Sequence, residues 1–193
     1  MTSAEEPFVE FRRLELRLGT VTEVGDHPEA EKLYVLKVDI GEDEPRTVVT
    51  NIKPFYPPEK LKGARILIIA NLKPANFRGV KSFGMIVAAD DGELGGKGVS
   101  LLKPTSDVPD GTLMDCGLGT LGLRAEMKHV EKVVMRTGHV SGGCFSGIPV
   151  DAPEGCPAAA VAVIDGDKAM LLSDGKGCFM VADSEVKDGA PAL

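Results

Sequence analysis

A run of polar and basic side chains between residues 71 and 85 is the part of this sequence best suited to do chemistry. The run leaves an apolar segment at residues 65–72, turns at Pro74, and enters another apolar segment at residues 83–89. It carries cations, an amide and a hydroxyl: Lys73, Asn76, Arg78, Lys81 and Ser82. Such groups at the mouth of a small barrel can hold successive phosphates while exposed rings stack on bases. An ordinary basic hairpin is the alternative interpretation.

The charge of the chain is unevenly distributed. The formal net charge is −7, which by itself argues against a nucleic-acid partner, because Lys and Arg make the phosphate contacts. Most of the excess acid lies after residue 104, whereas residues 53–81 contain seven cations and only one acid, Glu59. This segment fits either a basic binding surface or a solvated stripe.

Other motifs lack the context that catalysis needs. Gly117 to Gly122 match G-x-G-x-x-G, but only a weak strand precedes them and no suitably spaced acid follows. Ser146 lies one place too late for a G-x-S-x-G elbow, and the three histidines do not cluster. The four cysteines are widely spaced, so buried thiols are expected, with a regulatory disulfide as the alternative. We therefore expect no enzyme, no cofactor and no metal site.

Five strands are expected to position the basic run. Apolar residues alternate with polar ones over residues 14–18 and 34–40, as in half-buried strands. Gly19 shifts this alternation, which indicates a bulge that bends the first strand. Further apolar segments follow at 46–52, 65–72 and 83–89, with prolines and a glycine at 57–63 that favour a short helix. Five strands with a helix after the third predict an OB-fold barrel over residues 1–104.

The second half, residues 105–193, is expected to form a small, mostly-β domain with one helix. The helix is predicted over residues 123–136 from an apolar face of Leu123, Met127, Val130 and Val134. Apolar segments at 158–164 and 169–172 are too hydrophobic for a free surface. We expect some of them to pack on the barrel near its first strand and to cover an edge there.

The sequence gives no reason to expect a membrane or secreted protein. No apolar run approaches the roughly 18 to 20 residues of a membrane span. The first residues show neither the basic nor the apolar region of a secretory signal, so a cytoplasmic protein is expected.

Four stretches of the first half resemble a known family. They are LELRLGTV (Leu14 to Val21), HPEAEKLYVLKVDIG (His27 to Gly41), PRTVVTNI (Pro45 to Ile52) and NLKPANFRGVKSFGM (Asn71 to Met85). In order and spacing they are similar to the tRNA-binding module of the endothelial-monocyte-activating-polypeptide-like cofactors of aminoacyl-tRNA synthetases. The same module extends methionyl- and tyrosyl-tRNA synthetases at their C-termini. VPDG (Val108 to Gly111), LRAEMKHVEKV (Leu123 to Val133) and GIPV (Gly147 to Val150) resemble the extra C-terminal domain of eukaryotic members.

The resemblance implies binding of tRNA by shape and backbone, without sequence specificity, and its delivery to a synthetase by a free cofactor or an appended domain. It assigns phosphate contacts to Arg17, Lys32, Arg46, Lys73, Arg78 and Lys81. It assigns positioning or base contact to Asn71, Asn76, Ser82 and Met85. Phe77 stands where the family often has Met, and residues 53–56 depart from its Gly-rich stretch, so the tRNA surface is expected to differ in detail.

Assembly and two rival functions complete the expectations. In the longer relatives the C-terminal domain stands in for the second barrel of a dimer, so a monomer is expected. One rival function is a protein-interaction scaffold of a synthetase complex with little tRNA affinity. The other is a chaperone-like OB protein, which the extra domain disfavours.

Overall fold

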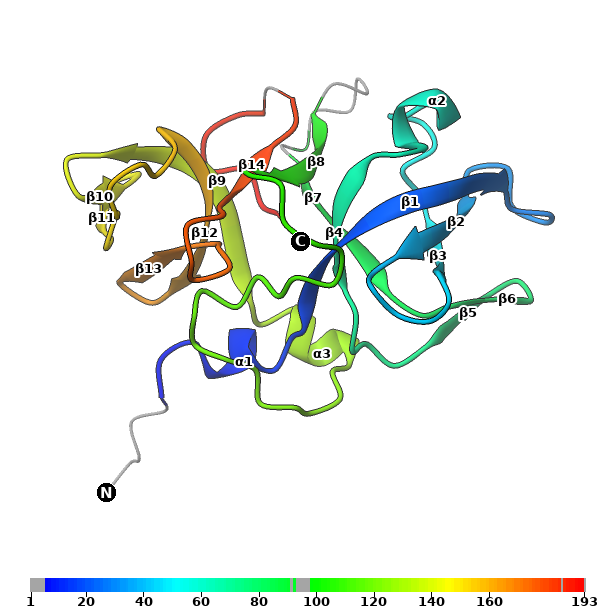
Figure 1. Ribbon diagram of the computed structural model, residues 1–193, viewed down its shortest axis with the longest axis horizontal. Coiled ribbons are helices and arrows are strands. Elements are labelled where there is room, and N and C mark those ends of the chain that lie inside the picture. The colour runs from blue at the N-terminus through cyan, green and yellow to red at the C-terminus, as the bar shows by residue number, and fades with distance from the viewer. Residues whose placement is uncertain (1–5, 91, 93–97, 185, 193) are drawn as a thin grey trace.

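The protein is mainly β, as the sequence predicts. The computed structural model describes residues 6–90, 92, 98–184 and 186–192 (Figure 1). Its largest sheet runs in the order β14 (Met180–Ala182), β8 (Val99–Pro104), β7 (Met85–Asp90), β4 (Arg65–Ile69), β1 (Leu16–Asp26), β2 (Tyr34–Asp39) and β3 (Arg46–Thr50). Every neighbouring pair in this sheet is antiparallel.

The five expected strands of the first half form a nearly closed barrel. They are β1, β2, β3, β4 and β7, and the helix α2 (Pro58–Leu61) lies between β3 and β4 as the prolines predict. Alternate side chains of β2 are buried, namely Tyr34, Leu36 and Val38, and they share a core with Ile66 and Ile68 of β4. The OB-fold barrel prediction is therefore confirmed.

Gly19 has a different role from the expected bulge. The register between β1 and β2 shifts between Val21 and Glu23, not at Gly19. A Cβ at Gly19 would lie 2.6 Å from the carbonyl oxygen of Asp39 and 2.7 Å from Cγ2 of Ile40. The glycine is therefore needed where β1 passes close to β2, and the bend follows a few residues later.

A second sheet occupies the other half of the molecule. Its strands run in the order β11 (Ile148–Pro149), β10 (Cys144–Phe145), β9 (Val134–Ser141), β12 (Ala159–Asp165) and β13 (Lys168–Leu171). A short helix, α1 (Val9–Arg12), precedes the barrel and contacts the helix α3 (Met127–Val130).

The helix predicted over residues 123–136 is wrong in extent. Only α3 is helical, and β9 begins at Val134. Leu123, Met127 and Val134 are exposed, whereas Val133 and Met135 are buried. This alternation is that of a strand, and pairing of β9 with β12 satisfies the backbone there. Tertiary pairing has overridden an apolar spacing that also fits a helix.

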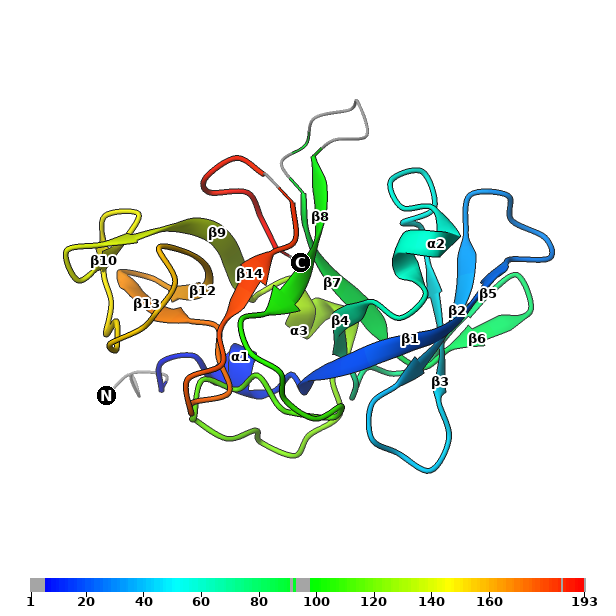
Figure 2. The same cartoon turned by 45° about the horizontal axis from the view of Figure 1, so that its top comes forward.

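The two halves share one apolar core. Leu16 and Leu18 of β1 lie in the same buried cluster as Val161 and Val163 of β12. The turned view in Figure 2 shows β14, near the C-terminal end, beside β8, which extends the barrel sheet from β7 and pairs with β14. Residues 111–114 run along the start of β1, where the Leu18 amide donates to Thr112 (3.0 Å).

We predict that Gly19→Ala lowers the free energy of unfolding by about 1–3 kcal/mol, because the added methyl group overpacks the crossing of β1 and β2. Gly25→Ala is the matched control in the same strand, since its Cβ would come no closer than 3.7 Å to the Val35 carbonyl oxygen. Urea unfolding measures both variants. Equal stability of the two would contradict this account of Gly19.

Candidate nucleic-acid interface

A two-stranded hairpin projects from the barrel at the basic run (Figure 1). Its strands are β5 (Ala75–Phe77) and β6 (Val80–Ser82), with Asn76 opposite Lys81. The turn residues Arg78 and Gly79 have φ angles of 46° and 91°. Two successive left-handed residues are typical of the type I′ turn, which suits the twist of a hairpin. Asn76 supports the turn, because its Oδ1 accepts the Gly79 amide at 2.8 Å.

Two sets of hydrogen bonds fix this hairpin to the barrel. Ser82 is buried, and its Oγ accepts from the Val49 amide and donates to the Gly84 carbonyl, each at 2.9 Å. On the other side, Nε2 of His27 lies 2.7 Å from the Phe77 carbonyl oxygen, and Nη1 of Arg78 donates to the Glu29 carbonyl (2.7 Å). The hairpin is thus tied to β3 and to the loop between β1 and β2.

Three of the expected phosphate contacts are exposed cations. Lys32 lies in the loop between β1 and β2, Lys73 lies just before the hairpin, and Lys81 lies on β6. Within the described ranges of the chain, their ammonium groups form no hydrogen bond or ion pair. Arg78, at the hairpin tip, is also exposed and uses Nη1 for the bond to Glu29. These four side chains can offer charge to an anionic partner.

Arg17 and Arg46 are instead held by the fold. Arg17 is half-buried, donates to the Gly111 carbonyl (3.0 Å) and pairs with Glu15. Arg46 donates to both carboxylate oxygens of Glu42 (2.7 and 2.6 Å) and to the carbonyls of Ala70 and Phe83. The hydrogen bond from Arg46 lowers the pKa of Glu42, while partial burial opposes this shift.

Asn71 and Met85 are also engaged in contacts within the fold. The carboxamide oxygen of Asn71 accepts the Glu15 amide (2.9 Å), and its nitrogen donates to the carbonyls of Arg13 (2.8 Å) and Leu123 (2.7 Å). The side-chain amide therefore joins three segments of the chain. Met85 is half-buried against the shared core.

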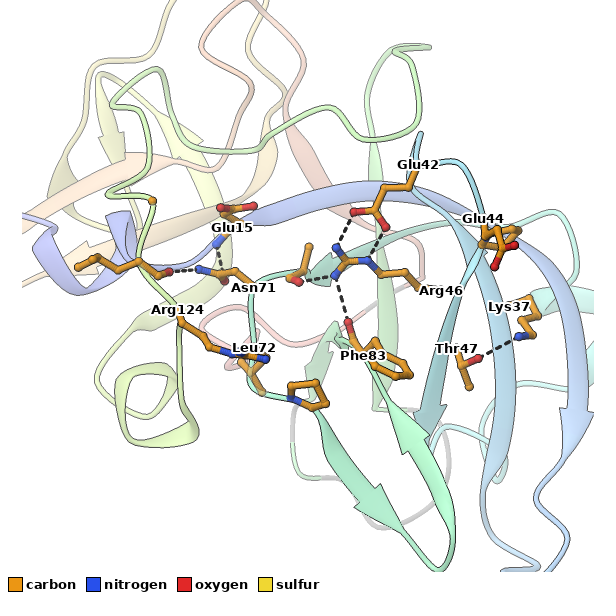
Figure 3. A pocket seen from close by; sticks show the side chains of 15 residues that line it. Glu15, Lys37, Glu42, Glu44, Arg46, Thr47, Asn71, Leu72, Phe83 and Arg124 are labelled. Carbon is orange, nitrogen blue, oxygen red and sulfur yellow. Dashed lines mark hydrogen bonds and ion pairs between the residues drawn. The ribbon is translucent and has the colours of Figure 1, made fainter.

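A pocket of about 670 Å³ opens beside these residues, at the seam between the halves (Figure 3). Figure 3 shows Phe83 between Arg124 on one side and Thr47 and Lys37 on the other. We call this pocket the seam pocket. It is lined by Glu15, Lys37, Glu42, Glu44, Pro45, Arg46, Thr47, Ala70, Asn71, Leu72, Pro74, Phe83, Gly122, Leu123 and Arg124.

Three residues that line the seam pocket were not predicted as site residues from the sequence: Lys37, Phe83 and Arg124. Strand alternation places Lys37 on the outer face of β2, which is a signal that could have identified it. Phe83 and Arg124 carry no such signal, because their exposure depends on how the hairpin and the second half meet the barrel. Arg124 was expected within the helix over residues 123–136.

The other polar groups and thiols that the structure describes can be checked for metal-binding or thiol chemistry. Among the described residues no group of three or more His, Cys, Asp or Glu could hold a metal ion. All four cysteines are free thiols, and Cys178 is buried while the other three are half-buried. Burial raises the pKa of Cys116 to about 12, which keeps it a thiol at neutral pH. No described helix is long and apolar enough to cross a membrane.

Comparison with known proteins agrees with this geometry. Residues 16–113 match the family model described as "Putative tRNA binding domain". The chain belongs to this family. The matched region contains the barrel, the hairpin and residues 111–113 of the segment that runs along β1.

Two synthetases and one solved structure illustrate the relationship. The chain is 52% identical over 101 residues to a methionine--tRNA ligase of Thermococcus kodakarensis, an alignment that covers 52% of this chain and 13% of that protein. It is 48% identical over 77 residues to the cytoplasmic tyrosine--tRNA ligase of Gallus gallus, covering 40% and 15%. The C-terminal domain of Plasmodium vivax p43 has the same fold, with a TM-score of 0.63, 23% identity, and coverage of 94% and 98%.

We predict that Glu42→Gln lowers the free energy of unfolding at pH 7 by less than about 1 kcal/mol, because the ion pair with Arg46 is partly exposed. A carboxylate whose pKa is lowered by folding stabilises the fold above its ordinary pKa of 4.5. The stabilisation is lost as the pH falls through the folded pKa. Denaturant unfolding at pH 7 and pH 3 checks this, with Asp43→Asn as control. A difference that persists unchanged at pH 3 would contradict it.

Proposed function

We propose that this protein binds tRNA through its phosphate backbone, without sequence specificity, and delivers it to an aminoacyl-tRNA synthetase. The observation that carries the proposal is the set of exposed cations on and beside the hairpin: Lys32, Lys73, Arg78 and Lys81. They face solvent although the chain as a whole has a net charge of −7. Family membership and the names of the relatives support tRNA as the anion.

Little capacity for base reading remains on this face. The polar groups that could read base edges are largely used within the fold, namely the amide of Asn71, the hydroxyl of Ser82 and the guanidinium of Arg46. Lysine ammonium groups are compact charges on flexible stems, and they contact phosphates without fixed geometry. Recognition by backbone and shape therefore fits the residues that remain, and identity is left to the synthetase.

The role is binding, not catalysis. The chain spans only about an eighth of the length of the synthetases it matches, in a region assigned to tRNA binding. A weak site held beside a synthetase raises the local tRNA concentration and so its apparent affinity, without any new catalytic contact. We place this role in the cytoplasm, with the translation machinery.

A protein-interaction scaffold is the second candidate. Leu123 and Met127 favour it, because these residues are 46% and 47% exposed in the second half of the chain. Exposed apolar side chains of this size suit a protein partner. A scaffold that has lost tRNA affinity would form no salt-sensitive complex with tRNA.

The proposal predicts that Lys73→Ala and Lys81→Ala each weaken binding of unfractionated tRNA, and to the same extent for different single tRNAs. Each variant should also reduce the slope of log K against log salt concentration by about 0.7–0.9, the value for one phosphate contact. Filter binding at several salt concentrations measures this. Lys168→Ala is the control, since Lys168 is exposed on β13, in the second sheet. Unchanged binding by Lys73→Ala and Lys81→Ala would contradict the assignment.

We also propose that the chain acts as a monomer of two halves that fold together. Residues 111–114 occupy the side of β1 that a second barrel could otherwise use, and the halves share a core. Sedimentation should therefore show a monomer for the full chain. A chain ending at Lys103 should dimerise or unfold, because Leu16 and Leu18 lose their apolar cover. A dimeric full chain, or a stable monomeric barrel, would contradict this proposal.

A further inference from the structure

The seam pocket is built by both halves of the chain. The barrel contributes Lys37, Thr47 and Phe83, and the second half contributes Leu123 and Arg124. Its volume of about 670 Å³ lies within the usual range of roughly 300–1,000 Å³ for sites that take a small molecule or a part of a larger one. The pocket opens next to Pro74, where the chain leaves β4 for the hairpin.

We infer that the seam pocket receives one unpaired nucleotide of the bound RNA, with its base against Phe83 and its phosphate at Arg124. The inference rests on the proposed function. It adds that the protein contacts single-stranded RNA at one place, through a base, besides the backbone contacts of the hairpin.

The ring of Phe83 is presented to solvent by a fixed backbone. The residue is 42% exposed. Its amide donates to the Thr47 carbonyl (2.9 Å), and its own carbonyl accepts from Arg46 (3.1 Å). Because its backbone is already fixed, the residue loses little further conformational entropy when a base stacks on its ring. Leu72, Pro74 and Leu123 line the same pocket and add apolar surface.

The charges around the pocket suit one phosphate. Glu15 is paired with Arg17, and Glu42 with Arg46. The lining charges left without an ion pair to any described residue are Lys37, Arg124 and Glu44, so the local balance is one positive charge.

Lys37 and Arg124 also have unused hydrogen-bond donors. Lys37 donates one hydrogen bond, to Oγ1 of Thr47 (2.9 Å), and therefore keeps two donors. The guanidinium of Arg124 forms no hydrogen bond within the described ranges. Arg124 can therefore donate to a phosphodiester group on one side of the ring, and Lys37 adds positive charge on the other side.

An unpaired nucleotide fits better than a duplex. Bases within an A-form helix are stacked and cannot lie against a protein ring, whereas unpaired ends and loops can be splayed out. Stacking of a base on an aromatic side chain contributes about 1–3 kcal/mol and tolerates any base. The pocket would therefore favour RNA with a free end or loop without selecting a sequence.

The test compares three RNA hairpins of identical stem: one blunt, one with a four-nucleotide 3′ overhang, and one with an abasic overhang of the same length. The two overhangs carry the same phosphates and differ only in their bases. The full chain is expected to bind the overhang with bases at least about 5-fold more tightly than the abasic one, as stacking of one base requires. Phe83→Leu should abolish this difference and leave affinity for the blunt hairpin unchanged.

Two further variants make the test specific. Phe55→Leu is the matched control, because Phe55 is also exposed (36%) but does not line the pocket, and it should keep the difference. Arg124→Gln should weaken both overhang RNAs alike, since both carry the phosphate. Equal affinity of the unsubstituted chain for the two overhangs would overturn the inference while leaving the proposed function intact. Failure to bind any hairpin would overturn this inference, and failure to bind unfractionated tRNA as well would overturn the proposed function.

Discussion

The side-chain amide of Asn71 holds together the three chain segments between which the candidate site lies. It bonds to residues 13 and 15, just before β1, and to residue 123 of the second half. Backbone bonds continue the same junction, since the amide of Lys73 donates to Ala125 and that of Ala125 donates to Asn71. The hairpin leaves from this junction, and the seam pocket lies against it. Both parts of the interface therefore lie next to the contacts that Asn71 makes between the halves.

The polar residues of this region divide into two groups. Those with directional hydrogen bonds, such as Ser82 and Arg46, are used to fix the hairpin and the rim of the barrel. Those with flexible, exposed charge, such as Lys73 and Lys81, remain free for a partner. A hydrogen-bonded hairpin that carries exposed lysines can bind a phosphate backbone, and such binding weakens as the salt concentration rises. It also explains how a chain with a net charge of −7 can bind an anion, because the acid lies largely elsewhere.

The barrel could be predicted from the sequence because its strands alternate cleanly. Tyr34, Leu36 and Val38 mark the inner face of β2, and this period survives in the structure. Residues 123–136 could not be assigned in the same way. Their apolar spacing fits a helix, but the pairing of β9 with β12 decides the outcome, and that pairing joins residues far apart in the sequence. The shared core and the seam pocket could not be predicted from the sequence for the same reason. Both are formed by residues of the two halves, as Phe83 and Arg124 show, and these residues come together only in the folded chain.

The most direct test of the account is amide hydrogen exchange of the full chain with and without tRNA. The account predicts slower exchange with tRNA at residues 73–83, in the loop 27–33 and at residues 122–126. It predicts no change at residues 141–150, in the distant strands β10 and β11 (Figure 1). Protection confined to the second sheet, or none at the hairpin when tRNA is bound, would contradict the account.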